Sequence, residues 1–296
     1  MCLAILLPLT LQTINAGKPE PVTAKLKKLE LSRVNVIPIQ ESNSKRQYEL
    51  YIKLPEDYSK NNKDKTFPVI YFTDALWAIE MLSSSTEYIM EDAILVGISW
   101  QKNIDEGLDA NSGEHVSRYR DFTFIESNKP ELQAKFKPGQ AGNHVEFIKR
   151  DVIHYVEQNY RADSTNRTYF GYSAGAEFGA YILLTQKGLF KNYILGSPSV
   201  TADSLEYLSN LKFNATLEAK TAEAKTAKAK TAKNKVFISR GSLEEKPSVH
   251  INSLVDMLNT RSMANSDITY EIIDGTHKTA YPMTAVRSVI WLSEQN

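Results

Sequence analysis

A short glycine-serine pattern constrains the fold of this chain more than any other feature of its sequence. The pentapeptide Gly171–Gly175 (GYSAG) follows the β-branched and aromatic stretch Thr168–Phe170 and precedes the helical pattern Ala176–Leu184. Between a strand and a helix, a GxSxG turn holds its serine hydroxyl out at the carboxyl edge of a sheet. The bare pattern arises by chance in roughly one chain in ten of this length. The flanking elements therefore carry the prediction that Ser173 is a nucleophile.

The rest of the chain alternates between strand and helix patterns. A polar stretch at residues 40–46 separates the first two predicted strands, which indicates an antiparallel hairpin. Continuous apolar runs such as Pro68–Phe72 and Ala93–Ile98 are expected of central strands covered on both faces. The alternation predicts an α/β fold with a mostly parallel central sheet, antiparallel N-terminal strands and helices on both faces. The predicted strands are residues 33–39, 48–54, 68–72, 93–98, 168–170, 192–196, 235–239 and 269–273, and the predicted helices are 145–160, 177–186, 249–261 and 284–294.

The composition excludes some classes of function. The 296 residues carry 35 basic and 35 acidic side chains, and this zero net charge does not favour nucleic-acid binding. A hydrophobic content of 42% argues against global disorder. The length suits one large α/β domain or two small ones. We assign residues 31–296 to one domain, preceded by a loose, proline-punctuated lead-in at residues 17–30.

The first sixteen residues differ from the rest. Residues 2–11 form an apolar run too short to span a bilayer, and small residues near Ala16 mark a cleavage point. We interpret residues 1–16 as a secretory signal peptide, with a buried N-terminal strand or helix as the alternative. The basic segment that normally comes first is missing, so we expect the true start to lie upstream. This predicts a secreted or periplasmic protein without a stable membrane span. Cys2, the only cysteine, lies in this segment, so a chain cut after Ala16 would form no disulfide.

A five-residue Ala-Lys-Thr repeat at residues 219–233 interrupts the alternation of strands and helices. The repeat is rich in helix formers, but a period of five drifts around a 3.6-residue helix and leaves no consistent apolar face. We interpret residues 218–234 as an exposed, partly helical low-complexity insertion. Binding to an acidic surface is the less favoured alternative, and the sequence leaves the role of the repeat open.

A histidine and a carboxylate lie where a serine nucleophile would need them. In hydrolases with this elbow, the serine is followed along the chain by an acid and then by a histidine. Of five histidines, His277 is the one that follows the last predicted strand and can reach Ser173. At the end of the preceding strand, Glu244 is our choice of acid and Glu245 the reserve, while Asp274 is a weaker competitor. The acid would accept the imidazole N–H and orient the ring.

The same chemistry needs two backbone N–H groups to hold an oxyanion. One is expected from the residue after the nucleophile, Ala174, at the positive end of the following helix. The second is expected from the loop after the strand at residues 68–72. In that loop, Thr73–Trp77, the candidates are Leu76 and its neighbour Ala75.

From about Val34 to its end, the chain resembles the putative-esterase branch of the α/β-hydrolases, which includes esterase D-like and enterochelin esterase-like enzymes. The ordered matches are Leu54–Tyr58, Pro68–Asp74, Val96–Ile98, Arg118–Thr123, Gly139–Gly142, the elbow, Leu189–Phe190 with Ser197–Ser199, Gly241–Glu244 and Gly275–His277. Ala75 and Ala176 stand where the family usually has glycine. The resemblance implies an α/β-hydrolase fold for residues 31–296.

The resemblance also implies a function. It predicts a serine carboxylic ester hydrolase with an acyl-enzyme, a Ser-His-Glu triad and no cofactor or metal, acting on simple acyl esters or siderophore-type lactones. The alternatives are an acyltransferase with the same triad and a non-catalytic binding protein on the same fold. Candidate substrate-binding residues are Trp77, Arg120 and Tyr172. Arg118 and Arg120 are equally well explained by local structure, with Asp121 as a neighbouring partner. The expected partner is a small-molecule ester, not a nucleic acid, and the oligomeric state is left open.

Overall fold

The computed structural model describes residues 33–59, 63–104, 113–211, 233–260 and 266–295. All of them belong to the unit formed by residues 32–296. The predicted signal peptide at 1–16, the lead-in at 17–30 and residues 218–232 of the predicted insertion lie outside the described residues and stay predictions. Within the described ranges, no helix combines the length and the apolar character needed to cross a bilayer.

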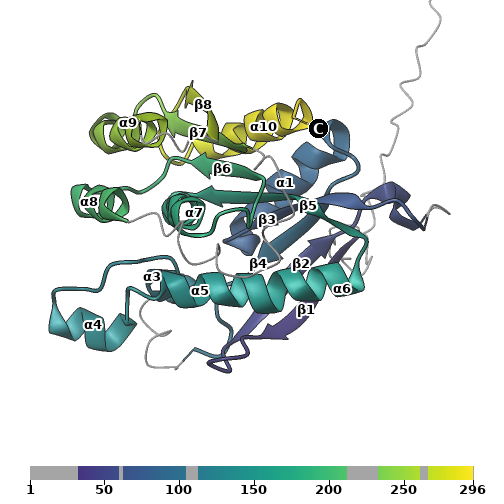
Figure 1. The fold of residues 1–296 in the computed structure, drawn as a ribbon, viewed down its shortest axis with the longest axis horizontal. Helices are drawn as coiled ribbons and strands as arrows, with labels where there is room; N and C mark the ends of the chain where they lie inside the picture. Colours follow the sequence, from purple (N-terminus) through teal and green to yellow (C-terminus); the bar gives the residue numbers. More distant parts are fainter. Residues whose placement is uncertain (1–32, 60–62, 105–112, 212–232, 261–265, 296) are drawn as a thin grey trace, which may run out of the picture. The chain divides into compact units, whose positions relative to one another are not determined.

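The described strands form one eight-stranded sheet in the order β1-β2-β4-β3-β5-β6-β7-β8 (Figure 1). The predicted hairpin is present, since β1 pairs antiparallel with β2. Strand β2 also runs antiparallel to β4, and each later neighbouring pair is parallel. The predicted α/β class with antiparallel N-terminal strands is therefore confirmed. The strands are β1 (Val34–Gln40), β2 (Gln47–Lys53), β3 (Phe67–Phe72), β4 (Ile94–Ile98), β5 (Ala162–Tyr172), β6 (Asn192–Gly196), β7 (Asn234–Gly241) and β8 (Ser266–Ile273).

Helices cover both faces of the sheet. Helices α1 (Ala75–Ile89) and α10 (Ala280–Ser293) lie side by side on one face (Figure 1). The helices that pack on the other face are α5 (Ala141–Phe147), which continues through the π-helical turn η3 (Ile148–Ile153) into α6 (His154–Asn159), then α7 (Ala174–Thr185), α8 (Ala202–Asn210) and α9 (Glu245–Thr260). Short helices are η1 (Glu56–Ser59), η2 (Glu114–Ser117), α3 (Arg118–Asp121) and α4 (Pro130–Phe136).

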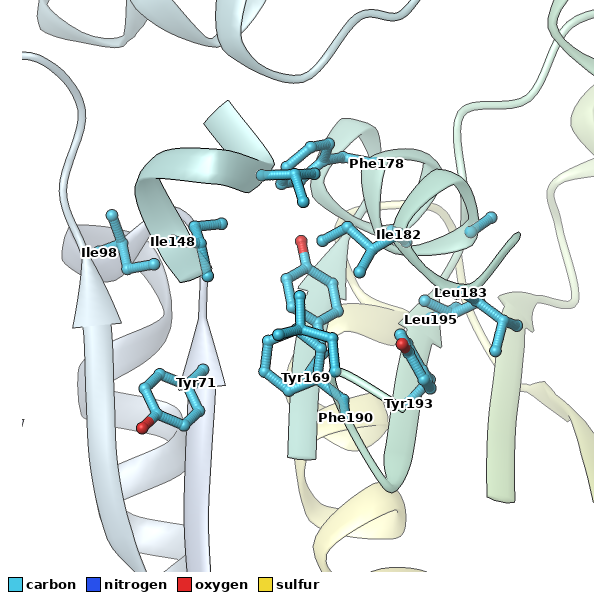
Figure 2. Packing of buried hydrophobic residues seen from close by; sticks show 14 of the residues in the cluster. Tyr71, Ile98, Ile148, Tyr169, Phe178, Ile182, Leu183, Phe190, Tyr193 and Leu195 are labelled. Atoms are coloured by element: carbon cyan, nitrogen blue, oxygen red, sulfur yellow. The ribbon is translucent and has the colours of Figure 1, made fainter. Parts of the chain in front are cut away.

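Alternate residues of the central strands pack on opposite faces of the sheet, because successive side chains of a strand point to opposite sides. On β5, Tyr169 packs with the α5–α9 face, whereas its neighbour Phe170 packs with α1 and α10. Figure 2 shows Phe178 and Ile182 of α7 lying over Tyr169 and Tyr193 of the sheet. Because both faces are covered, the strands read as continuous apolar runs. This packing fixes the carboxyl edge of the parallel strands, where the predicted site residues lie.

Some elements differ from the sequence prediction. The stretch Thr73–Trp77 is expected as a loop, but only Thr73 and Asp74 connect β3 to α1, and Ala75 is already helical. Asp74 has a left-handed backbone conformation (φ 56°), which turns the chain from strand to helix in two residues. Helix α1 is hidden in the sequence because Ser83, Ser85 and Thr86 interrupt its buried, apolar side. Strand β5 begins six residues before the apolar stretch at 168–170, and α8 is likewise unpredicted.

Candidate active site

Ser173 occupies the sharp turn between β5 and α7, in the strand–turn–helix context that the pentapeptide predicts. Its backbone has φ 57° and ψ −121°, a region that residues with a side chain rarely adopt. A Cβ on Gly171 would lie 2.3 Å from the carbonyl oxygen of Gly175. A Cβ on Gly175 would lie 2.5 Å from Oγ1 of Thr73. The two glycines therefore allow the turn and the β3–α1 connection to pack tightly around the serine.

Glu244 and His277 lie against one another at the ends of β7 and β8. Nδ1 of His277 is 2.6 Å from Oε1 of Glu244. The other carboxylate oxygen accepts hydrogen bonds from the hydroxyl of Ser197, at 2.8 Å, and from the backbone N–H of Gly241. Glu244 is 5% exposed, so these donors replace the water that it lacks. The ring of His277 is held by Nδ1, while Nε2 has no hydrogen-bond partner among the described residues.

The two competing carboxylates have other surroundings. Glu245 is the first residue of α9 and is exposed. Asp274 is also exposed, and it accepts a hydrogen bond of 2.9 Å from the hydroxyl of Ser242. Of the three candidate acids, Glu244 is thus the one that the fold brings to the ring of His277.

A turn after β6 connects the serine to the acid. At one end of the turn, the hydroxyl of Ser199 lies 2.9 Å from the hydroxyl of Ser173. At the other end, Ser197 has a left-handed backbone (φ 40°) and donates to Glu244. Neither serine has a role predicted from the sequence. The only signal was that the triplet Ser197–Ser199 belongs to the family resemblance, since the contacts themselves depend on how β6 lies between β5 and β7.

Backbone N–H groups from two helix N-termini face the same end of the sheet. In α7 the carbonyl of Ser173 accepts from Ala176 and Glu177, which leaves the N–H of Ala174 outside these first-turn bonds. In α1 the carbonyl of Asp74 accepts hydrogen bonds from the N–H groups of Trp77 and Ala78. The N–H groups of Ala75 and Leu76 take no part in these first-turn bonds. Helix N-termini carry partial positive charge. The packing of Gly175 against Thr73 brings these two N-termini together.

Asp74 anchors the start of α1 from inside the protein. It is 4% exposed and is contacted by Nε of Arg118 at 2.6 Å and by the indole N–H of Trp100 at 2.7 Å. Burial raises the pKa of Asp74, and Arg118 and Trp100 oppose that effect. The guanidinium of Arg118 also lies 4.9 Å from the ring centre of Trp77. These contacts hold Asp74, the residue directly before the amides of Ala75 and Leu76, in one conformation.

The three predicted substrate-binding residues are placed differently from one another. Trp77 is 44% exposed and packs edge-on against Trp100. The guanidinium of Arg120 pairs with the carboxylate of Asp121 at 2.7 Å and lies 3.2 Å from the hydroxyl of Tyr48. It is Arg118, and not Arg120, that contacts Asp74 at the start of α1. Tyr172 is buried beneath the site.

The hydroxyl of Tyr172 supports the histidine loop. It donates to the backbone carbonyl of His277 at 2.6 Å and lies 3.1 Å from Oγ of Ser197. Its ring stacks on Tyr281, with centroids 4.1 Å apart. Burial raises the pKa of Tyr172 to about 12, so it stays a neutral donor at physiological pH. These contacts suit a residue that positions His277 rather than one that meets a substrate.

A cavity of about 340 Å³ lies beside this constellation, between the Ser197–Val200 turn and the start of α9. His277 and Glu244 belong to its wall. In the part of the chain that the structure describes, no three His, Cys, Asp or Glu side chains come together as a metal site would require. The arrangement brings a serine hydroxyl, a histidine ring held by a carboxylate and the backbone amides of two helix N-termini to one edge of the sheet.

The chain matches a family model and a curated protein that are both described as esterases. A family model described as Putative esterase matches residues 42–282. The ferri-bacillibactin esterase BesA of Bacillus subtilis (strain 168) is 27% identical over 163 residues, which cover 53% of this chain and 55% of BesA. The chain therefore spans about half the length of this curated relative.

Solved structures share the fold. The BES protein from Bacillus cereus has a TM-score of 0.70 at 24% identity, covering 91% of this chain and 98% of its own. An IroE-like serine hydrolase from Shewanella oneidensis has a TM-score of 0.68 at 20% identity, covering 88% of this chain and 80% of its own. At these identities the likeness concerns the architecture, which is the α/β-hydrolase type.

Proposed function

The chain belongs to the putative esterase family, and on this premise we propose that it is a serine carboxylic ester hydrolase that acts through an acyl-enzyme. The observation that carries the proposal is the 2.6 Å hydrogen bond between His277 and Glu244, next to the strained turn of Ser173. A carboxylate on Nδ1 fixes the tautomer in which Nε2 is free to accept a proton. That is the arrangement a serine nucleophile needs.

In the acylation step, Oγ of Ser173 attacks the ester carbonyl carbon and its proton passes to Nε2 of His277. The resulting imidazolium is stabilised by Glu244, whose negative charge lies against Nδ1. The carbon–oxygen bond to the alcohol then breaks, and His277 gives its proton to the departing oxygen. Because Ser173 is hydrogen-bonded to Ser199 at rest, its side chain must first turn toward His277.

In the deacylation step, water takes the place of the alcohol. His277 removes a proton from the attacking water, and the acyl carbon–Oγ bond breaks with return of that proton to Ser173. The amides of Ala174 and of Leu76 or Ala75 would stabilise the oxyanion in both steps. One such donor contributes about 2.7–4 kcal/mol of transition-state stabilisation. Ala75, which is fully buried, replaces the usual glycine, and we expect its small side chain to be compatible with this geometry.

The substrates proposed are simple acyl esters and siderophore-type lactones. BesA, by its name, is an esterase for ferri-bacillibactin, and the similarity to it motivates the second class. Both classes present an ester carbonyl to the same nucleophile, so the triad does not discriminate between them. A panel of short acyl nitrophenyl esters and siderophore lactones, assayed with and without an added acceptor alcohol, would define the substrate and separate hydrolysis from acyl transfer.

The proposal is tested by activity-based labelling. A fluorophosphonate probe should label the wild-type protein, and peptide mass spectrometry should find the adduct on Ser173. Folded Ser173→Ala protein should lose the label and about 10⁶-fold of its esterase activity. Equal ester hydrolysis by Ser173→Ala and wild type would overturn the proposal. Folded wild-type protein that neither labels nor hydrolyses would favour a non-catalytic binding function.

We also propose export, because the signal peptide predicted at residues 1–16 and a siderophore-related substrate both suit an extracellular or periplasmic site. Expression of the full chain in a bacterial host, followed by fractionation and N-terminal sequencing, tests this. The expected result is exported protein that begins after Ala16. Protein that stays in the cytoplasm with residues 1–16 attached would contradict it.

A further inference from the structure

The cavity beside the triad has a wall that the proposed chemistry does not use. Ser199 and His277 form the side next to the nucleophile. Lys246, Pro247 and His250 form the side contributed by the first two turns of α9. Its volume of about 340 Å³ lies within the range of small-molecule sites. A group attached to the ester at Ser173 would therefore extend toward α9.

Lys246 and His250 give this wall its chemical character. They are four residues apart on one helix, so both lie on the side that faces the cavity. Within the described part of the chain, neither side chain forms an ion pair or a hydrogen bond. Lys246 supplies a full positive charge and His250 a ring nitrogen. Pro198 and Val200 add apolar surface to the same cavity.

The carboxylate in the cavity wall is already engaged within the protein. Glu244 accepts hydrogen bonds from His277, Ser197 and Gly241, and its charge lies against Nδ1 of His277. Glu245, its neighbour, is exposed and does not contribute to the wall. Lys246 supplies the positive charge of the wall, and a carboxylate could reach it on the α9 side of the cavity.

We propose that the cavity is a subsite for a carboxylate carried by the alcohol portion of the ester, which makes esters of hydroxy acids the preferred substrates. The assignment to the alcohol portion follows from proton transfer, because His277 must lie beside the oxygen that leaves. The group attached to that oxygen then enters the cavity whose wall His277 forms. The inference rests on the proposed esterase function and adds the charge of the leaving group to it.

The test compares two acetyl esters that differ only in the charge of the alcohol, 4-acetoxybenzoate and 4-acetoxybenzamide. Release of the phenol is followed by absorbance for the wild type, Lys246→Ala, Lys246→Glu and His250→Gln. Lys246→Ala should lower kcat/KM for the benzoate by about 10-fold, mainly through KM. It should change the benzamide less than about twofold, and Lys246→Glu should show the larger loss. Lys187→Ala, which removes the same charge from an exposed position just after α7, is the matched control.

Equal effects of Lys246→Ala on both esters, or no effect on the benzoate, would overturn the subsite while leaving the esterase intact. Failure of the wild type to cleave either ester would instead count against the proposed function. In that case the subsite is still tested by calorimetric titration of 4-hydroxybenzoate into the protein. Weaker binding to Lys246→Ala than to wild type supports the subsite, and equal or undetectable binding to both contradicts it.

Discussion

The hydroxyl oxygens of Ser173 and Ser199 lie 2.9 Å apart, so the proposed nucleophile is paired with a second serine. We expect this bond to weaken once Oγ of Ser173 bonds to the acyl carbon, because Oγ then has no proton to donate. A neutral hydrogen bond of this kind contributes about 0.5–1.5 kcal/mol. We therefore expect Ser199 to stabilise the resting serine more than the transition state.

Replacement of Ser199 by alanine should make the nucleophile more reactive. Without its resting partner, Ser173 in Ser199→Ala should react with a fluorophosphonate about 2–10-fold faster, in line with the strength of the lost bond. Ser199→Thr, which keeps a hydroxyl, should stay closer to wild type. Slower phosphonylation of Ser199→Ala would show that this hydroxyl aims the nucleophile instead of restraining it.

Neighbouring glutamates at the start of α9 should differ sharply in their effect on catalysis. Glu244→Gln removes the negative charge from Nδ1 of His277 and permits the wrong tautomer, so kcat should fall by about 10⁴-fold. Glu245→Gln, which alters an exposed side chain, should remain within about twofold of wild type. Steady-state hydrolysis of a nitrophenyl ester measures both. A larger loss in Glu245→Gln than in Glu244→Gln would refute the assignment.

The ion pair between Asp74 and Arg118 should stabilise the fold and should hold the backbone amides of Ala75 and Leu76 in place. Asp74→Asn leaves the mostly buried Arg118 without its counter-charge, and we expect a loss of about 3 kcal/mol in the free energy of unfolding. Urea denaturation measures this loss, with Asp256→Asn on the exposed side of α9 as the control. An unchanged urea midpoint in Asp74→Asn would show that the pair does not anchor α1.

Glu177 should make the stability of the protein fall as the pH rises. Burial between α7 and α8 raises its pKa from 4.5 to about 7, with a hydrogen bond to Ser204 opposing the shift. Since the folded state holds the proton more tightly, this contribution is complete below pH 4.5 and is lost as the pH rises through 7. Glu177→Gln mimics the protonated side chain. It should match wild type near pH 4 and exceed it by roughly 3 kcal/mol at pH 8.

Urea denaturation at the two pH values tests this expectation. The exposed Glu206→Gln on α8 serves as a control that alters charge without burial. A difference between Glu177→Gln and wild type that is the same at both pH values would contradict a raised pKa.

Local patterns were sufficient for the elements that depend on local chemistry. The strand before Ser173, the helix after it and the hairpin at the start of the sheet were all predictable from residue periodicity and turn chemistry. Helix α1 was not predictable in this way, because its turn from β3 depends on Asp74 adopting a left-handed conformation. That conformation is held by Arg118 and Trp100, which lie far away in the sequence.

The candidate site also contains parts that were predictable from the sequence and parts that were not. The positions of His277 and Glu244 after late strands were predictable because parallel strands place their carboxyl ends at one edge of the sheet. The contacts of Ser197 and Ser199 were not, since they arise where three neighbouring strands end together. The roles expected for Arg120 and Tyr172 depended on side-chain direction. Asp121 and the backbone of His277 set those directions in the fold.

By itself, the sequence determined the order of strands and helices and the presence of a serine on a strained turn, because φ/ψ preferences and apolar periodicity act over a few residues. Only the tertiary structure decided which carboxylate meets His277, which hydroxyl pairs with Ser173 and which basic side chains face the cavity. Glu244 and Glu245 are adjacent in the chain but point to different surroundings. The reason is physical: side-chain direction is set by the packing of β6, β7, β8 and α9 against one another, and the contacts of the site join residues more than a hundred positions apart.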